Sequence, residues 1–122
     1  MFTITLVIFL FIEMIWQTGI ARKFYKKELG ALMRAQVNGY AAGLFYLIYT
    51  AGIVIFVIRP NLEAGGAIAF LRGGGFGFVA YSTYNLISLA IIENWPIKMT
   101  IVDIVWGSLA TGLTAFIVVQ FY

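Results

Sequence analysis

Two acidic residues stand in stretches that are otherwise apolar. Glu13 is the only charged residue between positions 2 and 21, and Asp103 is the only one between positions 99 and 120. A charged side chain inside a bilayer costs about 3 kcal/mol on insertion scales, so each acid is a candidate for acid-base or proton-coupled chemistry. Asp103 also has a simpler interpretation, because an anion near the start of a helix is stabilised by the helix dipole.

The two acids belong to a repeated pattern. Glu13-Met14-Ile15-Trp16 and Asp103-Ile104-Val105-Trp106 both read acid, two apolar residues, tryptophan. This spacing places each acid about one turn from its tryptophan on one helix face. Trp16 and Trp106 are therefore expected as aromatic partners of the acids. An inverted repeat of the kind found in transporters is one explanation, and the ordinary enrichment of Trp near membrane interfaces is the other.

Further polar residues are spaced to share a helix face with one another. Tyr81, Asn85 and Ser88 follow each other at intervals of four and three residues. We expect an inward-facing polar cleft made of Glu13, Gln17, Asn38, Tyr81, Asn85, Ser88 and Asp103. The alternative is ordinary hydrogen bonding between helices, worth about 0.6 kcal/mol per pair.

Several chemistries are excluded or disfavoured because the chain lacks the residues or the complete motifs that they need. It contains no Cys and no His, which removes thiolate chemistry and the commonest metal ligand and general base, so no metal site is predicted. The glycine run at 73–75 has neither the Lys-Ser/Thr nor the preceding strand of a phosphate loop. The chain has many Tyr and Phe residues, which are typical of helix packing or of an interfacial belt rather than of a pigment or quinone site. No cofactor is therefore predicted.

The composition indicates that these residues lie in a membrane. Of 122 residues, 62% are apolar and 11% are charged, which is more apolar surface than a soluble domain of this size can bury. Four stretches reach the roughly 20 residues that cross a bilayer as a helix, at about 2–21, 35–58, 66–92 and 99–120. Since lipid-exposed backbone must satisfy its own hydrogen bonds, the sequence predicts an all-α, polytopic membrane protein. Short loops then favour a four-transmembrane-helix antiparallel bundle, forming one domain over residues 1–122.

Small residues mark the helix faces expected to touch. They recur at four-residue steps within the second, third and fourth stretches, as Gly39 and Gly43, Gly73 and Gly77, and Gly107 and Thr111. Small side chains let membrane helices approach closely. We therefore expect helix packing through these three faces.

Positive charges indicate the orientation. Most of them lie in or beside the connection between the first two stretches, at Arg22, Lys23, Lys26, Lys27 and Arg34. By the positive-inside rule this connection is cytoplasmic, which places both termini outside, in the periplasm if the membrane is a bacterial inner membrane. Arg72 lies near the outer end of the third stretch and is expected to reach lipid headgroups. Because the charges encode topology, no nucleic-acid partner is implied.

The chain resembles the small predicted membrane proteins of bacteria catalogued as domain of unknown function 2177. The resemblance extends over nearly the whole length and rests on these segments: Glu13-x-x-Trp16, Phe24-Tyr25, Leu29-Gly30, Val37-Asn38, Leu44-Phe45-Tyr46-Leu47 with Tyr49, Arg59-Pro60, Tyr81-x-Thr83-Tyr84, Trp95-Pro96 and Val102-Asp103-Ile104-x-Trp106-Gly107. It implies a four-helix integral membrane protein and carries no activity with it.

The chain departs from this family's pattern at polar positions. The family usually has Asp where this chain has Glu13, which keeps the charge, and Asp where it has Asn85, which does not. It also has Thr and Asn where this chain has Ile87 and Ser88. The amide at position 85 leaves hydrogen bonding intact but argues against an acid-base role there.

Three functions remain open. The leading hypothesis is a non-enzymatic accessory or assembly subunit that packs against lipid, other integral membrane proteins or its own copies, because the chain has no evident catalytic set. The second is a small proton-coupled transporter using Glu13. In size, span number and first-helix carboxylate the chain is similar to the small multidrug-resistance exporters, which work as dimers around such a glutamate. The third is an enzyme acting on lipid or isoprenoid, with Glu13, Asp103 and Tyr81 as acid-base groups.

Overall fold

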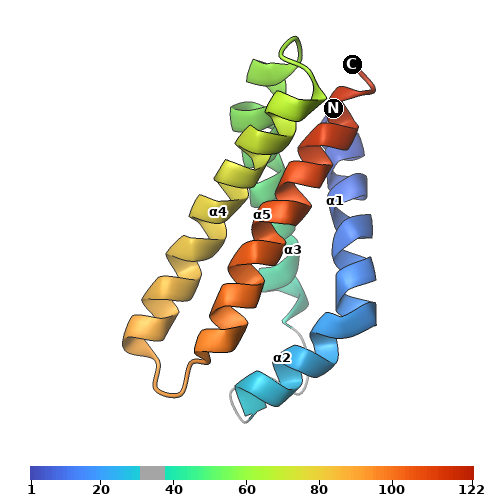
Figure 1. Ribbon diagram of the computed structural model, residues 1–122. Coiled ribbons are helices and arrows are strands. Elements are labelled where there is room, and N and C mark those ends of the chain that lie inside the picture. The colour runs from blue at the N-terminus through green and yellow to red at the C-terminus, as the bar shows by residue number, and fades with distance from the viewer. Residues whose placement is uncertain (31–37) are drawn as a thin grey trace.

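The computed structural model describes residues 1–30 and 38–122, and every regular element in these ranges is helical (Figure 1). The elements are α1 (Phe2–Trp16), a π-helical turn (Gln17–Ala21), α2 (Arg22–Leu29), α3 (Gly39–Ile53) with its π-helical continuation (Val54–Ile58) and a 3-10 turn (Arg59–Asn61), α4 (Gly66–Ile91) and α5 (Ile97–Val119). The all-α class is confirmed.

The number of helices differs from the expected four. The described chain has five α-helices, because part of the basic connection forms the short helix α2. Three helical stretches are long and apolar enough to cross a membrane, Phe2–Gly19, Gly39–Asn61 and Ile97–Val119. The helix α4 has 26 residues, so it has the length, but glycines, Arg72 and the polar residues of its second half lower its hydropathy. The structure therefore does not by itself confirm four spans.

The closest helix contact joins α4 and α5, which run antiparallel after a short turn. A Cβ atom added to Gly77 would lie 2.4 Å from the carbonyl oxygen of Gly107, and one added to Gly107 would lie 2.1 Å from the ring of Tyr81. Gly73 faces Ala115 and Thr111 in the same way. Small residues thus allow the two backbones to approach until side chains of one helix touch the backbone of the other.

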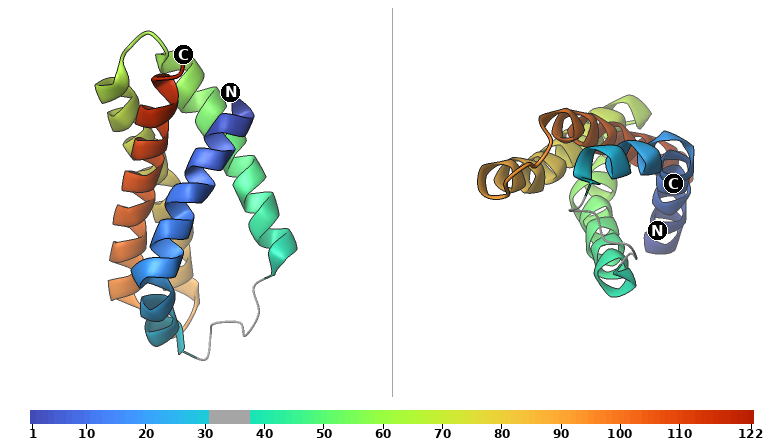
Figure 2. Two further views of the ribbon diagram at one scale, coloured as in Figure 1. Left: turned by 90° about the vertical axis from the view of Figure 1, so that its right-hand side faces the viewer. Right: turned by 90° about the horizontal axis from the view of Figure 1, so that it is seen from below.

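The helix α3 leaves the bundle toward its N-terminal end. Figure 2 shows α1 and α3 diverging toward the end of the molecule that carries α2. Within the described chain, a Cβ atom added to Gly39 or Gly43 would meet nothing within 4 Å. The expected close packing at these two glycines is therefore not found, because the splayed half of α3 has no helix of the described chain against it.

The connection between α3 and α4 is held by polar side chains. Asn61 is buried and donates from Nδ2 to the carbonyl oxygen of Val57 at 2.6 Å. Its Oδ1 accepts a hydrogen bond from Arg72 of α4. Gly65, with φ of 93°, supplies the left-handed turn before α4 begins. Arg72 thus contacts the turn through one hydrogen bond and is itself exposed, so its expected contact with lipid headgroups stays a prediction.

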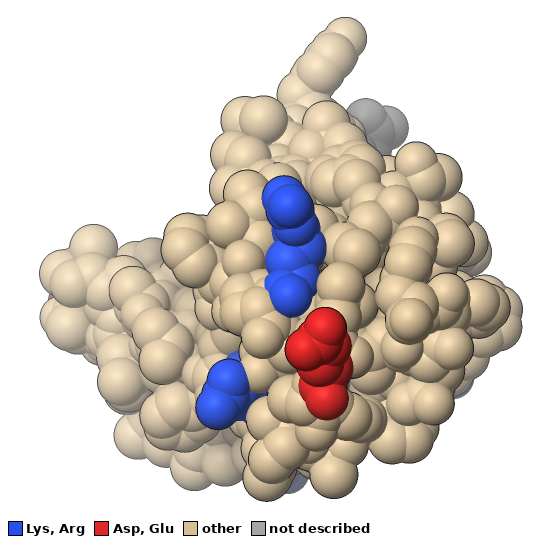
Figure 3. All heavy atoms as spheres, turned by 90° about the horizontal axis from the view of Figure 1, so that it is seen from above, with Lys and Arg blue, Asp and Glu red and all other residues tan. Residues whose placement is uncertain are grey.

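The two ends of the bundle differ in charge. Four basic residues on α2 are exposed, namely Arg22, Lys23, Lys26 and Lys27. The fifth basic residue expected there, Arg34, lies outside the described residues. At the opposite end, which carries both termini, charged side chains are sparse among uncharged ones (Figure 3).

The outward faces of the long helices are apolar. Phe11, Phe56 and Leu71 are between 65% and 68% exposed, and they belong to three different helical segments. A soluble protein rarely exposes large apolar side chains over so much of its surface. Such a surface is expected to contact the hydrocarbon interior of a lipid bilayer.

Candidate functional site

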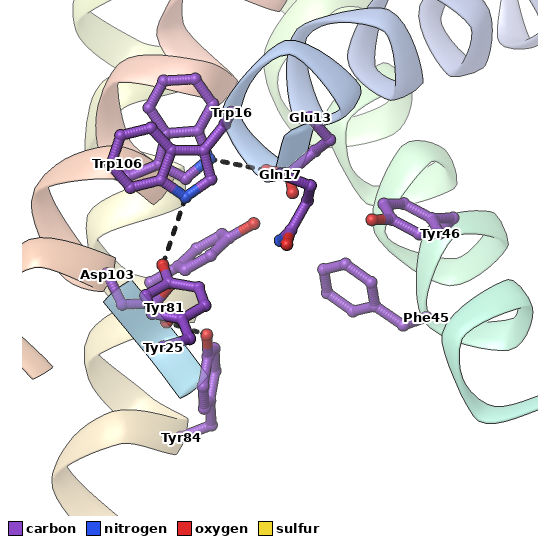
Figure 4. A pocket seen from close by; sticks show the side chains of 10 residues that line it. All are labelled: Glu13, Trp16, Gln17, Tyr25, Phe45, Tyr46, Tyr81, Tyr84, Asp103 and Trp106. Carbon is purple, nitrogen blue, oxygen red and sulfur yellow. Dashed lines mark hydrogen bonds between the residues drawn. The ribbon is translucent and has the colours of Figure 1, made fainter. Parts of the chain in front are cut away.

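The two acid-x-x-Trp motifs meet face to face. Because α1 and α5 run antiparallel, Glu13 on α1 comes level with Trp106 on α5, and Trp106 donates from Nε1 to Glu13 Oε1 at 2.9 Å (Figure 4). The indole rings of Trp16 and Trp106 stack with their centroids 4.4 Å apart and their planes 9° from parallel. Each motif therefore packs its tryptophan on that of the other.

A tyrosine completes the second half of this arrangement. Trp16 donates from Nε1 to the hydroxyl oxygen of Tyr25 at 3.3 Å, and that hydroxyl donates to Asp103 Oδ1 at 2.7 Å. Tyr25 belongs to α2, which the π-helical turn after α1 directs beneath the end of α5. The acid of α5 is thus linked to the tryptophan of α1 through one hydroxyl group, whereas the acid of α1 contacts the tryptophan of α5 directly.

Asp103 has further donors on α4. The hydroxyl of Tyr84 and Nδ2 of Asn85 both donate to its Oδ2, the latter at 2.8 Å. Together with Tyr25, three donors surround one carboxyl group that is 8% exposed. Such a set of donors suits an ionised carboxylate, which only accepts hydrogen bonds.

A cavity of about 500 Å³ opens beside these groups. Ten residues line it, contributed by every described helix: Glu13, Trp16, Gln17, Tyr25, Phe45, Tyr46, Tyr81, Tyr84, Asp103 and Trp106. Phe45 and Tyr46 form the wall on α3, across from the stacked indoles (Figure 4). The cavity therefore lies where α3 splays away from the other helices.

The Glu13 carboxylate faces this cavity. The residue is 6% exposed, and its carboxylate points toward the cavity, near Gln17 and the hydroxyl group of Tyr81 (Figure 4). Oε1 accepts a hydrogen bond from Trp106, and the side chain of Gln17 lies close enough to donate to the carboxylate as well. Among the described residues, Glu13 therefore has fewer hydrogen-bond donors than Asp103, which has three.

The environment of Tyr25 keeps its hydroxyl group protonated. Burial raises the pKa of Tyr25 above its ordinary value of 10.0, and the neighbouring Asp103 carboxylate raises it further. The hydroxyl remains a hydrogen-bond donor at physiological pH. It can therefore hold α2 against Asp103.

The structure brings together most of the expected cleft. Glu13, Gln17, Tyr81 and Asp103 line the cavity, and Asn85 adjoins it through its bond to Asp103. Asn38 and Ser88 do not line it. Asn38 instead caps α3, where its side chain accepts from the backbone N–H of Ala41 at 3.2 Å, and Ser88 lies one further turn along α4, toward the end of the helix.

Four lining residues were not expected in the cleft, namely Phe45, Tyr46, Tyr84 and Tyr25. Tyr25 stands in the basic connection. The basic residues around it were interpreted as a topology signal alone. A helical pattern was nevertheless present, because Phe24, Tyr25 and Leu29 are half-buried while the lysines between them are exposed. Residues spaced three to five apart on one side of a basic segment are typical of an amphipathic surface helix.

The acids do not form a cluster suited to a metal ion. Among residues 1–30 and 38–122, no group of three or more Asp, Glu, His or Cys residues is close enough to hold one. The oxygens of Asp103 are already engaged by three donors. The arrangement can bind a proton or another positively charged species at Glu13.

Comparison with known proteins agrees with the membrane character of the chain. No curated protein and no solved structure matches it. The model of the family described as "Predicted membrane protein (DUF2177)" matches residues 1–120, which is nearly the entire chain. The chain therefore belongs to this family of predicted membrane proteins.

Proposed function

We propose that the protein crosses a bacterial inner membrane four times, with both termini in the periplasm. The apolar outer surface and three apolar helices support a multi-pass protein, and α4 supplies a fourth span of sufficient length. The polar residues that lower its hydropathy, Tyr81 and Asn85, are buried against other helices and not turned to lipid. The exposed basic residues of α2 support a cytoplasmic location for that end.

Its proposed function is to bind a small organic ligand in the cavity between α1, α3, α4 and α5, without catalysis. The observation that carries this proposal is the cavity itself, whose volume of about 500 Å³ is within the range usual for ligand sites. Its lining also has the usual character, aromatic walls with a few buried polar groups. Bound lipid covers the apolar exterior, and no cofactor enters the proposal.

Native mass spectrometry of protein extracted from its own membrane tests ligand binding. We expect a molecule of defined mass to stay bound to the wild-type protein and to be lost from Glu13→Gln. Glu63→Gln is the matched control, because Glu63 is an exposed carboxylate in the α3–α4 connection. An empty wild-type protein argues against binding in the cavity, whereas equal retention by Glu13→Gln shows that binding does not depend on the charge of Glu13.

A second candidate function is assembly with another membrane protein or a second copy. The observation that favours it is the splayed half of α3, where Tyr40 is 95% exposed and Gly39 and Gly43 contact no described neighbour. Cross-linking through Gly43→Cys in native membranes tests it, with Gly75→Cys on α4 as the control; Gly75 is also a helical glycine with nothing within 4 Å. A lone monomer in mild detergent, with no cross-link at position 43, contradicts assembly.

Proton-coupled transport through Glu13 would be an extension of ligand binding. Glu13 lines the cavity, where Trp106 and Gln17 are its neighbouring hydrogen-bond donors. In vesicles, Glu13→Gln is then expected to abolish proton-coupled movement of the ligand. Unchanged flux in this variant ends the transport hypothesis and leaves ligand binding to be judged by the mass measurement.

A further inference from the structure

No basic residue of the described chain lines the cavity beside its acids. Of the ten lining residues within positions 1–30 and 38–122, Glu13 and Asp103 are acids and none is Lys or Arg. Both acids are more than nine-tenths buried. A buried carboxylate is costly unless it is hydrogen-bonded, paired with a positive charge or protonated.

The two acids differ in the number of hydrogen-bond donors around their carboxylates. Asp103 accepts hydrogen bonds from Tyr25, Tyr84 and Asn85, so its charge is well compensated by donors. Glu13 accepts a hydrogen bond from Trp106, has Gln17 as its other neighbouring donor, and faces the cavity. The site therefore has room at Glu13 for a proton or for a positively charged partner.

Aromatic rings form most of the remaining wall. Trp16, Trp106 and five other aromatic side chains line the cavity. The face of an aromatic ring attracts a cation within about 6 Å of its centroid, and such surroundings are well suited to amines that carry apolar substituents. They suit a small hydrated metal ion less well, since the lining oxygens other than the two acids belong to four neutral tyrosine hydroxyls and one amide.

We propose that the ligand of this cavity is an organic monocation, an ammonium or quaternary ammonium group on an apolar body. This inference rests on the proposed function and specifies the chemical class of its ligand. The positive group lies against the Glu13 carboxylate and the neighbouring ring faces, and the apolar body fills the space toward Phe45 and Tyr46 on α3. An anionic ligand is disfavoured by both carboxylates, and a dication by the donors already bound to Asp103.

Two probes of nearly equal shape test the charge requirement. Benzyltrimethylammonium carries a positive charge, whereas benzyldimethylamine N-oxide has no net charge at neutral pH. Binding is followed in detergent by quenching of tryptophan fluorescence, in a Trp95→Phe background that leaves Trp16 and Trp106 as the only reporters. We expect the cation to bind at least tenfold more tightly than the N-oxide.

Variants at one position separate charge from shape. Glu13→Gln should weaken binding of the cation at least tenfold, Glu13→Asp should retain most of it, and Glu63→Gln should leave it unchanged. Circular dichroism and thermal melting establish that each variant is folded. Retention by the aspartate variant keeps the test informative if the glutamine variant fails to fold, since loss of binding in Glu13→Asp while folded also counts against the proposal.

The outcomes distinguish this inference from the proposed function. Equal affinity for the two probes, or equal affinity of wild type and Glu13→Gln for the cation, overturns the monocation while leaving the cavity as a ligand site. Binding of neither probe, together with no molecule retained in native mass spectrometry, overturns both. Tighter binding of the cation that depends on the charge of residue 13 supports both.

Discussion

The contact between α4 and α5 makes a quantitative prediction about two glycines on one helix. A Cβ atom at Gly77 would lie 2.4 Å from the carbonyl oxygen of Gly107 and 2.8 Å from Oγ1 of Thr111. At Gly75, two residues earlier on the same helix, it would meet nothing within 4 Å. Gly77→Ala and Gly75→Ala each add one methyl group to the same helix. In Gly77→Ala the methyl group meets the backbone of α5, whereas in Gly75→Ala it points into open space.

The expected difference follows from these distances. An ordinary van der Waals contact begins at 3.4 Å, so Gly77→Ala forces the helices apart by roughly 1 Å. Overpacking of this kind costs about 1–3 kcal/mol. Both variants gain about 0.5–1 kcal/mol from replacing glycine by alanine within a helix, and this gain cancels in the comparison. We expect Gly77→Ala to be less stable than Gly75→Ala by about 1–3 kcal/mol.

Unfolding in mixed micelles with increasing sodium dodecyl sulfate measures this difference, with circular dichroism as the signal. Gly75→Ala should unfold at the same or a higher fraction of dodecyl sulfate than the wild type, and Gly77→Ala at a lower one. Equal stability of the two variants would refute the close approach of α4 and α5, and with it the placement of Tyr81 beside Gly107.

Four further predictions address the other contacts and the topology. Tyr25→Phe removes a hydrogen bond to a carboxylate worth about 1.5–3 kcal/mol, so a spin label at Lys23→Cys on α2 should become more mobile. Because the folded-state pKa of Tyr25 is raised, the docking of α2 should be fully stable below about pH 10 and weaken above it, a step that Tyr25→Phe abolishes. Asn61→Ala leaves Arg72 without its acceptor and should destabilise the protein by about 1–3 kcal/mol in thermal melting. Reporter tags at the two termini should both be periplasmic, because an even number of spans returns the chain to the side on which it began.

Each of these expectations has a contradicting result. Unchanged label mobility in Tyr25→Phe shows that α2 is not held by Asp103. A pH step that persists in this variant shows that another group causes it. A melting temperature for Asn61→Ala equal to that of the wild type removes the α3–α4 connection as a stabilising feature, and tags in opposite compartments exclude four spans.

The helices were largely predictable because hydropathy is a local property. Each observed long helix falls on one of the expected apolar stretches, and α4 and α5 meet through the expected small residues Gly73, Gly77 and Gly107. The splay of α3 was not predictable from Gly39 and Gly43. A small residue permits close approach but does not decide whether another helix is present.

The sequence predicted which residues form the site better than it predicted which of them bind one another. The spacing of acid and tryptophan placed each pair on one helix face, and antiparallel α1 and α5 bring these faces together. Trp106 of α5 binds Glu13 of α1 and not the acid of its own motif. This pairing depends on how far one helix is shifted along the other, which no local sequence pattern encodes. Tyr25 was missed because its neighbours carry a topology signal that hides the amphipathic pattern of α2.

A density map of the protein taken from its own membrane, with any bound molecule left in place, tests the central claim most directly. The predicted result is stacked indoles of Trp16 and Trp106, a hydrogen bond from Trp106 to Glu13, and non-protein density against the Glu13 carboxylate. A map in which the two acids lie on separate helix faces, or in which side chains of the protein fill the space between α1 and α3, would contradict it.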